Sequence, residues 1–169
     1  DWTAAFLADY IVQVHHSYVR TTSPNLVAWS QKVATRHGDR FAYLDEVRQI
    51  VQSVVNELDS HMFKEEHILF PYVKALEEAR SKGEISSAPF GTVANPIRMM
   101  EHEHEEVGQM ITRLQEITSN YTPPPDACNT FRVLFSTLKE FEDDLFLHIH
   151  LENNILFPKA LNLEKSGNK

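Results

Sequence analysis

The sequence is poor in cysteine, glycine and positive charge. Its 169 residues include one Cys and five Gly, and 16 Lys and Arg residues are outnumbered by 24 Asp and Glu residues. The single cysteine, Cys128, excludes a disulfide within the chain and suits a reducing compartment, so we expect a cytoplasmic protein. No cluster of Lys and Arg forms a basic face, which argues against a nucleic-acid partner.

Long apolar runs and alternating strand patterns are also missing. No apolar stretch approaches the ~20 residues of a membrane-spanning helix, and the start of the chain does not resemble a signal peptide. We therefore expect no contact with a membrane. Apolar residues recur at helical spacing instead, and at 42% of the chain they suffice for one core. The sequence predicts a single all-α domain over residues 1–161 and a frayed polar tail at 162–169.

Helical periodicity divides the chain into four long segments and one short one. The expected helices are 3–21, 24–37, 41–79, 96–119 and 126–161. We place a break at Thr22-Ser23-Pro24, because Ser23 suits a helix N-cap and Pro24 suits the first helical turn. Short to moderate connections favour an antiparallel four-helix bundle with an extra short helix after the first.

One pattern, His-x-x-x-Glu-x-x-Ile-Leu-Phe-Pro, occurs at 61–71 and again at 148–158. Residues four apart lie on one face of a helix, so each copy presents an imidazole and a carboxylate together. The two pairs are His61 with Glu65 and His148 with Glu152. If the two copies face each other, their four side chains surround one centre.

The apolar residues of the repeated pattern indicate where these pairs point. Ile68 and Ile155 lie seven residues past each His and are expected on the same face, which turns the pairs toward the core. The alternative is two exposed pairs that stabilise their helices by a few tenths of a kcal/mol each. Because a buried Glu without a cation is very costly, we favour a metal centre.

The remaining histidines divide by their register on the predicted helices. His15 and His104 lie on the core stripes of the first and third long helices and are expected to be further ligands. Along a continuous helix, His37 would lie roughly 33 Å from His15, so it can join them only if the chain turns sharply before Pro24. The histidines off these stripes, which we expect at the surface or around the ligands, are His16, His67, His102 and His150.

Carboxylates near the predicted ligands allow other interpretations. Glu101-x-x-His104 matches the Glu-x-x-His of ferritin-like di-iron sites, but it occurs once, so we favour His104 as a ligand and Glu101 as solvated. Glu57 and Glu103 are candidates for a proton carrier or for the lining of an access path, or are solvated, and no catalytic residue is assigned. Imidazoles and carboxylates without thiolate suit iron, manganese or zinc, and two carboxylates fit two bridged ions.

These motifs resemble the hemerythrin-like di-iron domains, and more closely their RIC (repair of iron centres) group, from Trp2 to about Ala160. The markers are Asp1-Trp2, His15, Arg36-His37, Ser60-His61-Met62, Lys64-Glu65-Glu66, Ile68-Leu69-Phe70-Pro71, Met100-Glu101, Glu103-His104, Thr122-Pro123-Pro124-Pro125, Ala127-Cys128, His148 and Leu151-Glu152-Asn153-Asn154. The resemblance implies two non-haem irons, bridged by both carboxylates and by an oxo or hydroxo group. The ligands that it implies are His15, His37, His61, Glu65, His104, His148 and Glu152.

Two features depart from that family pattern. In the oxygen-carrying hemerythrins the third long helix supplies two His one turn apart, whereas Met100 and Gly108 flank His104 here. This points away from a simple oxygen carrier. The RIC group usually has an N-terminal domain with a pair of Cys residues, which is absent from this chain, so functions that need those thiols are not expected of it.

The resemblance implies a stress-response protein that helps restore iron–sulfur clusters damaged by nitric oxide or oxidants, by donating iron to iron–sulfur proteins. One alternative is an enzyme that reduces nitric oxide to nitrous oxide at the di-iron site, with Glu57 or Glu103 delivering protons. Another is a module that binds or senses oxygen or nitric oxide. Because His37 ends a short predicted helix, we expect the iron that it binds to be the more labile one.

Overall fold

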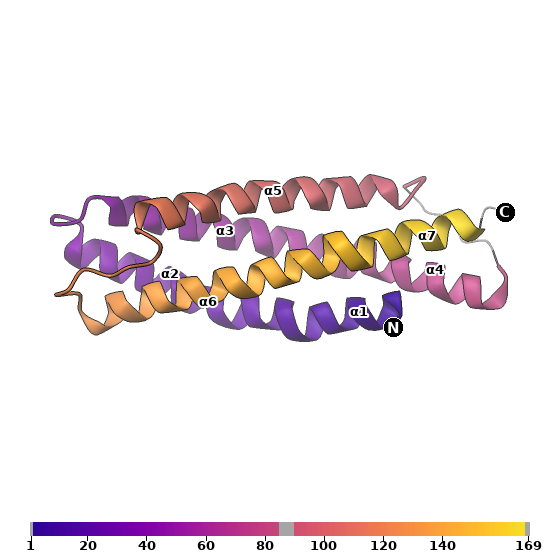
Figure 1. Cartoon of the computed structure of the whole chain (residues 1–169), viewed down its shortest axis with the longest axis horizontal. Helices are drawn as coiled ribbons and strands as arrows, with labels where there is room; N and C mark the ends of the chain where they lie inside the picture. The colour runs from indigo at the N-terminus through magenta and orange to yellow at the C-terminus, as the bar shows by residue number, and fades with distance from the viewer. Residues whose placement is uncertain (1, 85–89, 168–169) are drawn as a thin grey trace.

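The computed structural model describes residues 2–84 and 90–167, which form four helical rods without a strand. The rods are α1 (Ala4–Ile11), η1 (Val12–His16) and α2 (Ser17–His37); α3 (Tyr43–Lys64), η2 (Glu65–Leu69) and α4 (Phe70–Lys82); α5 (Ala94–Ile117); and α6 (Asn129–Leu151), η3 (Glu152–Leu156) and α7 (Phe157–Gly167). Successive rods run in opposite directions, and both chain ends lie at one end of the bundle (Figure 1). The predicted antiparallel four-helix bundle is confirmed.

The extra short helix is wrong, because the first rod does not break at Pro24. α2 continues through this proline to His37. A proline inside a helix removes one backbone hydrogen bond and costs about 3 kcal/mol. The buried side chains Val19, Leu26 and Val33 lie on both sides of Pro24 and join one apolar cluster with α3 and α6. Packing of both halves of α2 against the same two helices outweighs the local preference for a break.

The core consists of two apolar clusters that occupy opposite ends of the bundle. One lies among α2, α3, α6 and the C-terminal half of α5, and the other among α1, α4, α7 and the N-terminal half of α5. Near the middle of each rod, the buried apolar residues change from one cluster to the other. Along α5, for example, Met100 belongs to one cluster and Val107 to the other. Buried polar side chains lie at that boundary.

Three of the four rods contain a π-helical turn at this boundary. In η1, η2 and η3 the backbone N–H of the following residue donates to the carbonyl five residues earlier, as from Ser17 to Val12. Such a turn accommodates one more residue than an α-turn and shifts the register of the residues after it. Ile68 is therefore 47% exposed and Ile155 only half-buried, whereas Leu69 and Leu156 are buried. The expected inward register of the two isoleucines is wrong for this reason.

Part of the predicted polar tail is helical. α7 extends to Gly167, and the Glu164 carboxylate accepts hydrogen bonds from the Val93 backbone N–H and the Thr92 hydroxyl. These bonds attach the end of α7 to the start of α5. Asp1, which is part of the Asp1-Trp2 marker, and residues 168–169 of the predicted tail lie outside the described residues. No helix in the described part of the chain is long and apolar enough to cross a membrane.

Candidate metal centre

Six buried side chains from all four rods meet between the two apolar clusters. They are His16 from η1, His61 from α3, Glu65 from η2, His104 from α5, His148 from α6 and Glu152 from η3. Each is at most 6% exposed. Their donor atoms form two groups of four, and within each group the atoms lie within 4.8 Å of one another.

Both carboxylates belong to both groups, and each group adds two imidazoles. One oxygen of Glu65 lies 3.3 Å from His16 Nε2, and the other lies 3.3 Å from His61 Nε2. Glu152 does the same, with one oxygen 2.9 Å from His148 Nε2 and the other 3.1 Å from His104 Nε2. Two carboxylates that each face two donor groups form the arrangement that two bridged ions require.

The chemistry of these donors fits a bound cation. Both oxygens of Glu65 and one oxygen of Glu152 are buried and face imidazole nitrogens 3.1–3.3 Å away, without a hydrogen bond of good geometry within the described part of the chain. A buried carboxylate without compensation is very costly, and metal ions compensate it directly. Nitrogen and carboxylate oxygen donors without a thiolate suit non-haem iron.

Side chains around the six donors orient three of the four imidazoles through their Nδ1 atoms. His16 Nδ1 lies 2.6 Å from Glu66, and His61 Nδ1 lies 2.8 Å from Glu103. His104 Nδ1 lies 2.9 Å from the amide oxygen of Asn153. Each of these contacts leaves Nε2 directed at the centre, which is how proteins orient metal-binding histidines.

Comparison with known proteins gives the family. Residues 7–160 match the domain described as "Hemerythrin HHE cation binding domain". The chain belongs to the hemerythrin family. This domain binds non-haem iron, and the six buried donors provide a site able to hold it.

The chain is also similar to curated iron–sulfur cluster repair proteins. It is 41% identical over 165 residues to the "Probable iron-sulfur cluster repair protein" of Haemophilus influenzae, covering 96% of this chain and 69% of that protein. It is 41% identical over 164 residues to the "Iron-sulfur cluster repair protein YtfE" of Musicola paradisiaca, covering 95% and 68%. For the protein of that name in Escherichia coli the identity is 38% over 164 residues, covering 95% and 69%.

In this hemerythrin domain His16, rather than its neighbour His15, reaches the donor groups. The π-turn η1 adds one residue after Ile11, so His16 takes the inward position that α-helical spacing assigns to His15. The expectation that His16 lies at the surface or around the ligands is wrong, since it is fully buried among the donors. The adjacency of His15 and His16 in the sequence was the signal that could have indicated this outcome, because a shift of one residue in helical register puts one of them in the place of the other.

His15 is buried beside the centre without joining either group. Its Nδ1 lies 2.9 Å from Asp144, and its ring stacks on that of His148 with the centroids 5.6 Å apart. His15 Nε2, His148 Nδ1 and Asp144 Oδ2 have no hydrogen bond within the described part of the chain. His15 therefore supports the His148 side of the centre through ring packing.

His37 lies at the end of α2, in neither donor group. Its Nε2 lies 3.3 Å from Cys128 Sγ, and its ring packs against Phe131. Since α2 is continuous, the 21 positions from His16 to His37 correspond to about 31 Å. The turn at Pro24 that His37 required does not form, so lability of an iron cannot be assigned through this residue.

The other predicted groups separate by exposure. Glu103 contacts His61 and also pairs with Lys64, whereas Glu57 is exposed and lines a surface cavity with Glu106 and Arg113. The remaining four are exposed: Glu101, His67, His102 and His150.

Mutual attraction keeps the metal-free centre charged. Burial by itself lowers the pKa of His61, but the carboxylates of Glu65 and Glu103 outweigh it and raise that pKa to about 10. Burial likewise opposes ionisation of Glu103, yet His61 and Lys64 lower its pKa to about 2. Burial raises the pKa of Glu152, but His148 and His104 hold it well below its usual range. The His61 imidazolium therefore stands where a cation would bind, and iron must displace its proton.

Proposed function

We propose that this chain repairs damaged iron–sulfur clusters by holding two irons and donating iron to the affected protein. The observation that carries the proposal is the pair of donor groups that share Glu65 and Glu152. This centre lies in a chain that is about 40% identical, over most of its length, to proteins named for cluster repair. The donor set consists of four imidazoles and two carboxylates and contains no cysteine thiolate.

The donor chemistry supports transfer toward a cluster. When bound, iron supplies the ion that a broken cluster has lost. Cysteine thiolates and sulfide hold iron in clusters, and they are softer donors than imidazole and carboxylate. An acceptor rich in thiolates therefore competes favourably with the six donors of this domain. A reducing cytoplasm keeps such thiolates available, and it is the location that we propose.

Nitric oxide or oxygen binding is the second candidate function. Six protein residues cannot fill the coordination shells of two six-coordinate ions, so positions remain for small molecules. Because both donor groups share the same two carboxylates, two ions held there would lie close together and could supply chemistry for binding or reducing nitric oxide. Glu103 and Lys64 beside His61 are charged groups next to one of the two donor groups.

One anaerobic comparison separates the candidates. The iron-loaded protein is mixed with an apo-ferredoxin and sulfide, and cluster formation is followed by absorbance. We expect clusters to form with this protein, and not with a Glu65→Leu, Glu152→Leu double variant that lacks the shared carboxylates. A parallel sample of the di-ferrous protein receives nitric oxide, with a chemical reductant present to supply the two electrons that each nitrous oxide requires, and nitrous oxide is measured by gas chromatography. Turnover to nitrous oxide without iron transfer would replace repair by the enzymatic function, and a stable nitrosyl without transfer would indicate sensing.

A further inference from the structure

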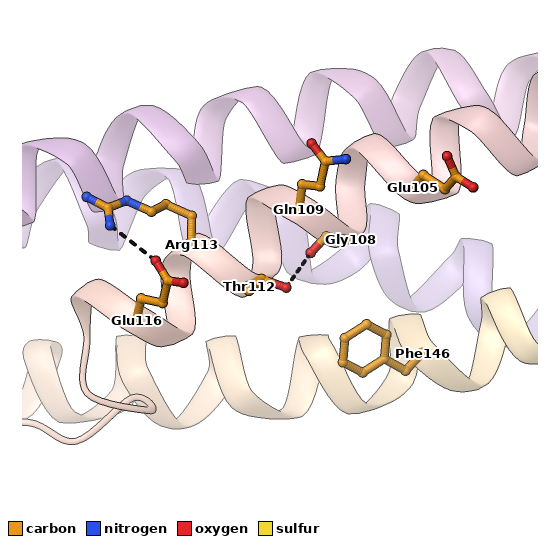
Figure 2. A pocket seen from close by; sticks show the side chains of 7 residues that line it. All are labelled: Glu105, Gly108, Gln109, Thr112, Arg113, Glu116 and Phe146. Atoms are coloured by element: carbon orange, nitrogen blue, oxygen red, sulfur yellow. Dashed lines mark hydrogen bonds and ion pairs between the residues drawn. The ribbon is translucent and has the colours of Figure 1, made fainter.

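A groove between α5 and α6 opens onto one of the six donors. A cavity of about 510 Å³ is lined by His104 itself, together with Asn153 and Ile149 from the fourth rod. It shares Glu105, Gly108 and Phe146 with a second cavity of about 530 Å³. Figure 2 shows this second cavity, in which Phe146 on α6 faces the residues of α5. The two cavities form one groove along the surface that reaches one of the six donors, His104.

His104 is more exposed and more weakly anchored than His16 and His61. At 6% it is the most exposed of the six donors, whose other members are 0–2% exposed. Its Nδ1 bonds to a neutral amide, that of Asn153, whereas His16 and His61 bond to the carboxylates of Glu66 and Glu103. Charge-assisted hydrogen bonds are roughly twice as strong as neutral ones. Among these three imidazoles, His104 therefore swings outward at the lowest cost.

The cavity next to His104 suits a passing cation. Glu101 and Glu105 line it, and no Lys or Arg is among the lining residues of this cavity in the described part of the chain. The space beside Gly108 in this cavity is open, since a Cβ built on this residue meets no atom within 4 Å. Negative charge lining a cleft raises the local concentration of cations and their rate of entry.

We propose that iron enters and leaves through the α5/α6 groove, that His104 is the ligand that swings, and that Asn153 is its latch. The iron held by His61 and His104 is then the first to be exchanged. This inference deepens the proposed donation of iron and rests on it only for its biological purpose, because exchange with any chelator follows the same route.

A plug in the groove tests the route. In Gly108→Trp the indole fills open space, and we expect iron loading of the apoprotein and iron release to a chelator to slow by the same factor, about tenfold. The final iron content and the equilibrium affinity stay unchanged, because a blocked path alters neither end state. Gly108→Ala is the size control, and Ser53→Trp on the exposed face of α3 controls for a surface tryptophan. Rates equal to those of the unmodified protein, or slowing of release alone, would overturn the route.

Variants of Asn153 test the latch. Asn153→Leu removes the acceptor of His104 Nδ1, and we expect the first iron to leave about tenfold faster while the second keeps its native rate. Asn153→Asp supplies a carboxylate of the same shape and slows release of the first iron. Anomalous diffraction at the iron edge from crystals of the one-iron intermediate identifies which position has emptied. Loss of both irons together at the native rate from Asn153→Leu would refute the latch. No acceptor protein is present, so a failure of cluster repair and a failure of this route are distinguishable.

Discussion

Two neighbouring histidines contribute differently to the centre at the residue scale. His16 directs Nε2 toward Glu65 and holds Nδ1 against Glu66, which itself pairs with Arg20. His15 directs its ring at His148 and its Nδ1 at Asp144. His16 is therefore placed to hold metal, whereas His15 packs against another metal-binding candidate, His148.

Substituting each histidine separately tests this difference between His16 and His15. We expect His16→Ala to lose at least the iron between His16 and His148, because one of the two imidazoles in that group is gone. His15→Phe keeps an aromatic ring against His148 and retains both irons. Metal analysis of the purified variants gives the answer, and full iron in His16→Ala with loss in His15→Phe would reverse the assignment.

The charge of His61 makes iron binding depend on pH. Its pKa of about 10 in the metal-free protein means that it carries a proton at neutral pH. Iron must displace that proton, so we expect protons to be released on loading and affinity to rise with pH toward 10. Glu103→Gln removes one carboxylate that raises this pKa, and it moves the pH profile of loading to lower values. Titration of loading at several pH values measures both effects, and a flat profile would contradict them.

The same raised pKa affects stability in the opposite direction. A group whose pKa is higher in the folded state stabilises the fold while protonated. The contribution of His61 to the metal-free protein is therefore fully present below pH 6.5 and is lost as the pH rises through 10. Alkaline conditions favour the iron-loaded form and weaken the metal-free one.

At the scale of elements, the π-turns determine which residues face the centre. η2 and η3 each begin with the shared carboxylate, and η1 ends with His16. Each turn carries one residue more than an α-helix needs between the same packed neighbours. π-turns are rare and often mark functional sites, and all three here lie at the metal centre.

Deleting a residue tests the role of η1. Val14 is 41% exposed in this turn. We expect its deletion to convert the turn to α-helix and leave α1 and α2 in their packed positions, costing about 1 kcal/mol, or about 2–4 °C in Tm. The control deletion is Ala28, which is exposed within regular α2 and whose loss rotates all later residues of that helix by about 100°. Thermal unfolding measures both, and equal losses would contradict an accommodating π-turn.

At the scale of the whole molecule, the centre is the polar layer that joins two apolar clusters. Each of the four rods supplies at least one donor. Without a cation, this layer contains buried charges whose desolvation opposes folding. Bound iron therefore holds the two ends of the bundle together.

Removal of iron and removal of a shared carboxylate should both lower stability. We expect chelation to lower the stability of the unmodified protein, by about 2.7 kcal/mol where free iron had been 100-fold above its Kd. Glu65→Leu leaves the buried His61 imidazolium without a carboxylate that balances it, so its metal-free form is less stable than the unmodified apoprotein. The variant also gains less from iron. Calorimetry of all four samples checks this order, and a Glu65→Leu apoprotein as stable as the unmodified one would contradict it.

The sequence by itself determined the four long rods, their antiparallel order and two of the donor pairs. Apolar periodicity is a local property, and the repeated His-x-x-x-Glu pattern places His61 with Glu65 and His148 with Glu152 on any helix. His104 followed from the same periodicity. The structure brings these five side chains together in the two donor groups.

Tertiary structure alone decided between His15 and His16 and placed His37 at the end of the bundle. The π-turn η1 lies between two helices that are packed against neighbouring rods, and regular spacing in the sequence does not reveal it. The continuity of α2 through Pro24 likewise depends on packing against α3 and α6. Local preference favoured a break, but the buried contacts on the two sides of Pro24 outweigh that preference, and those contacts exist only in the folded bundle.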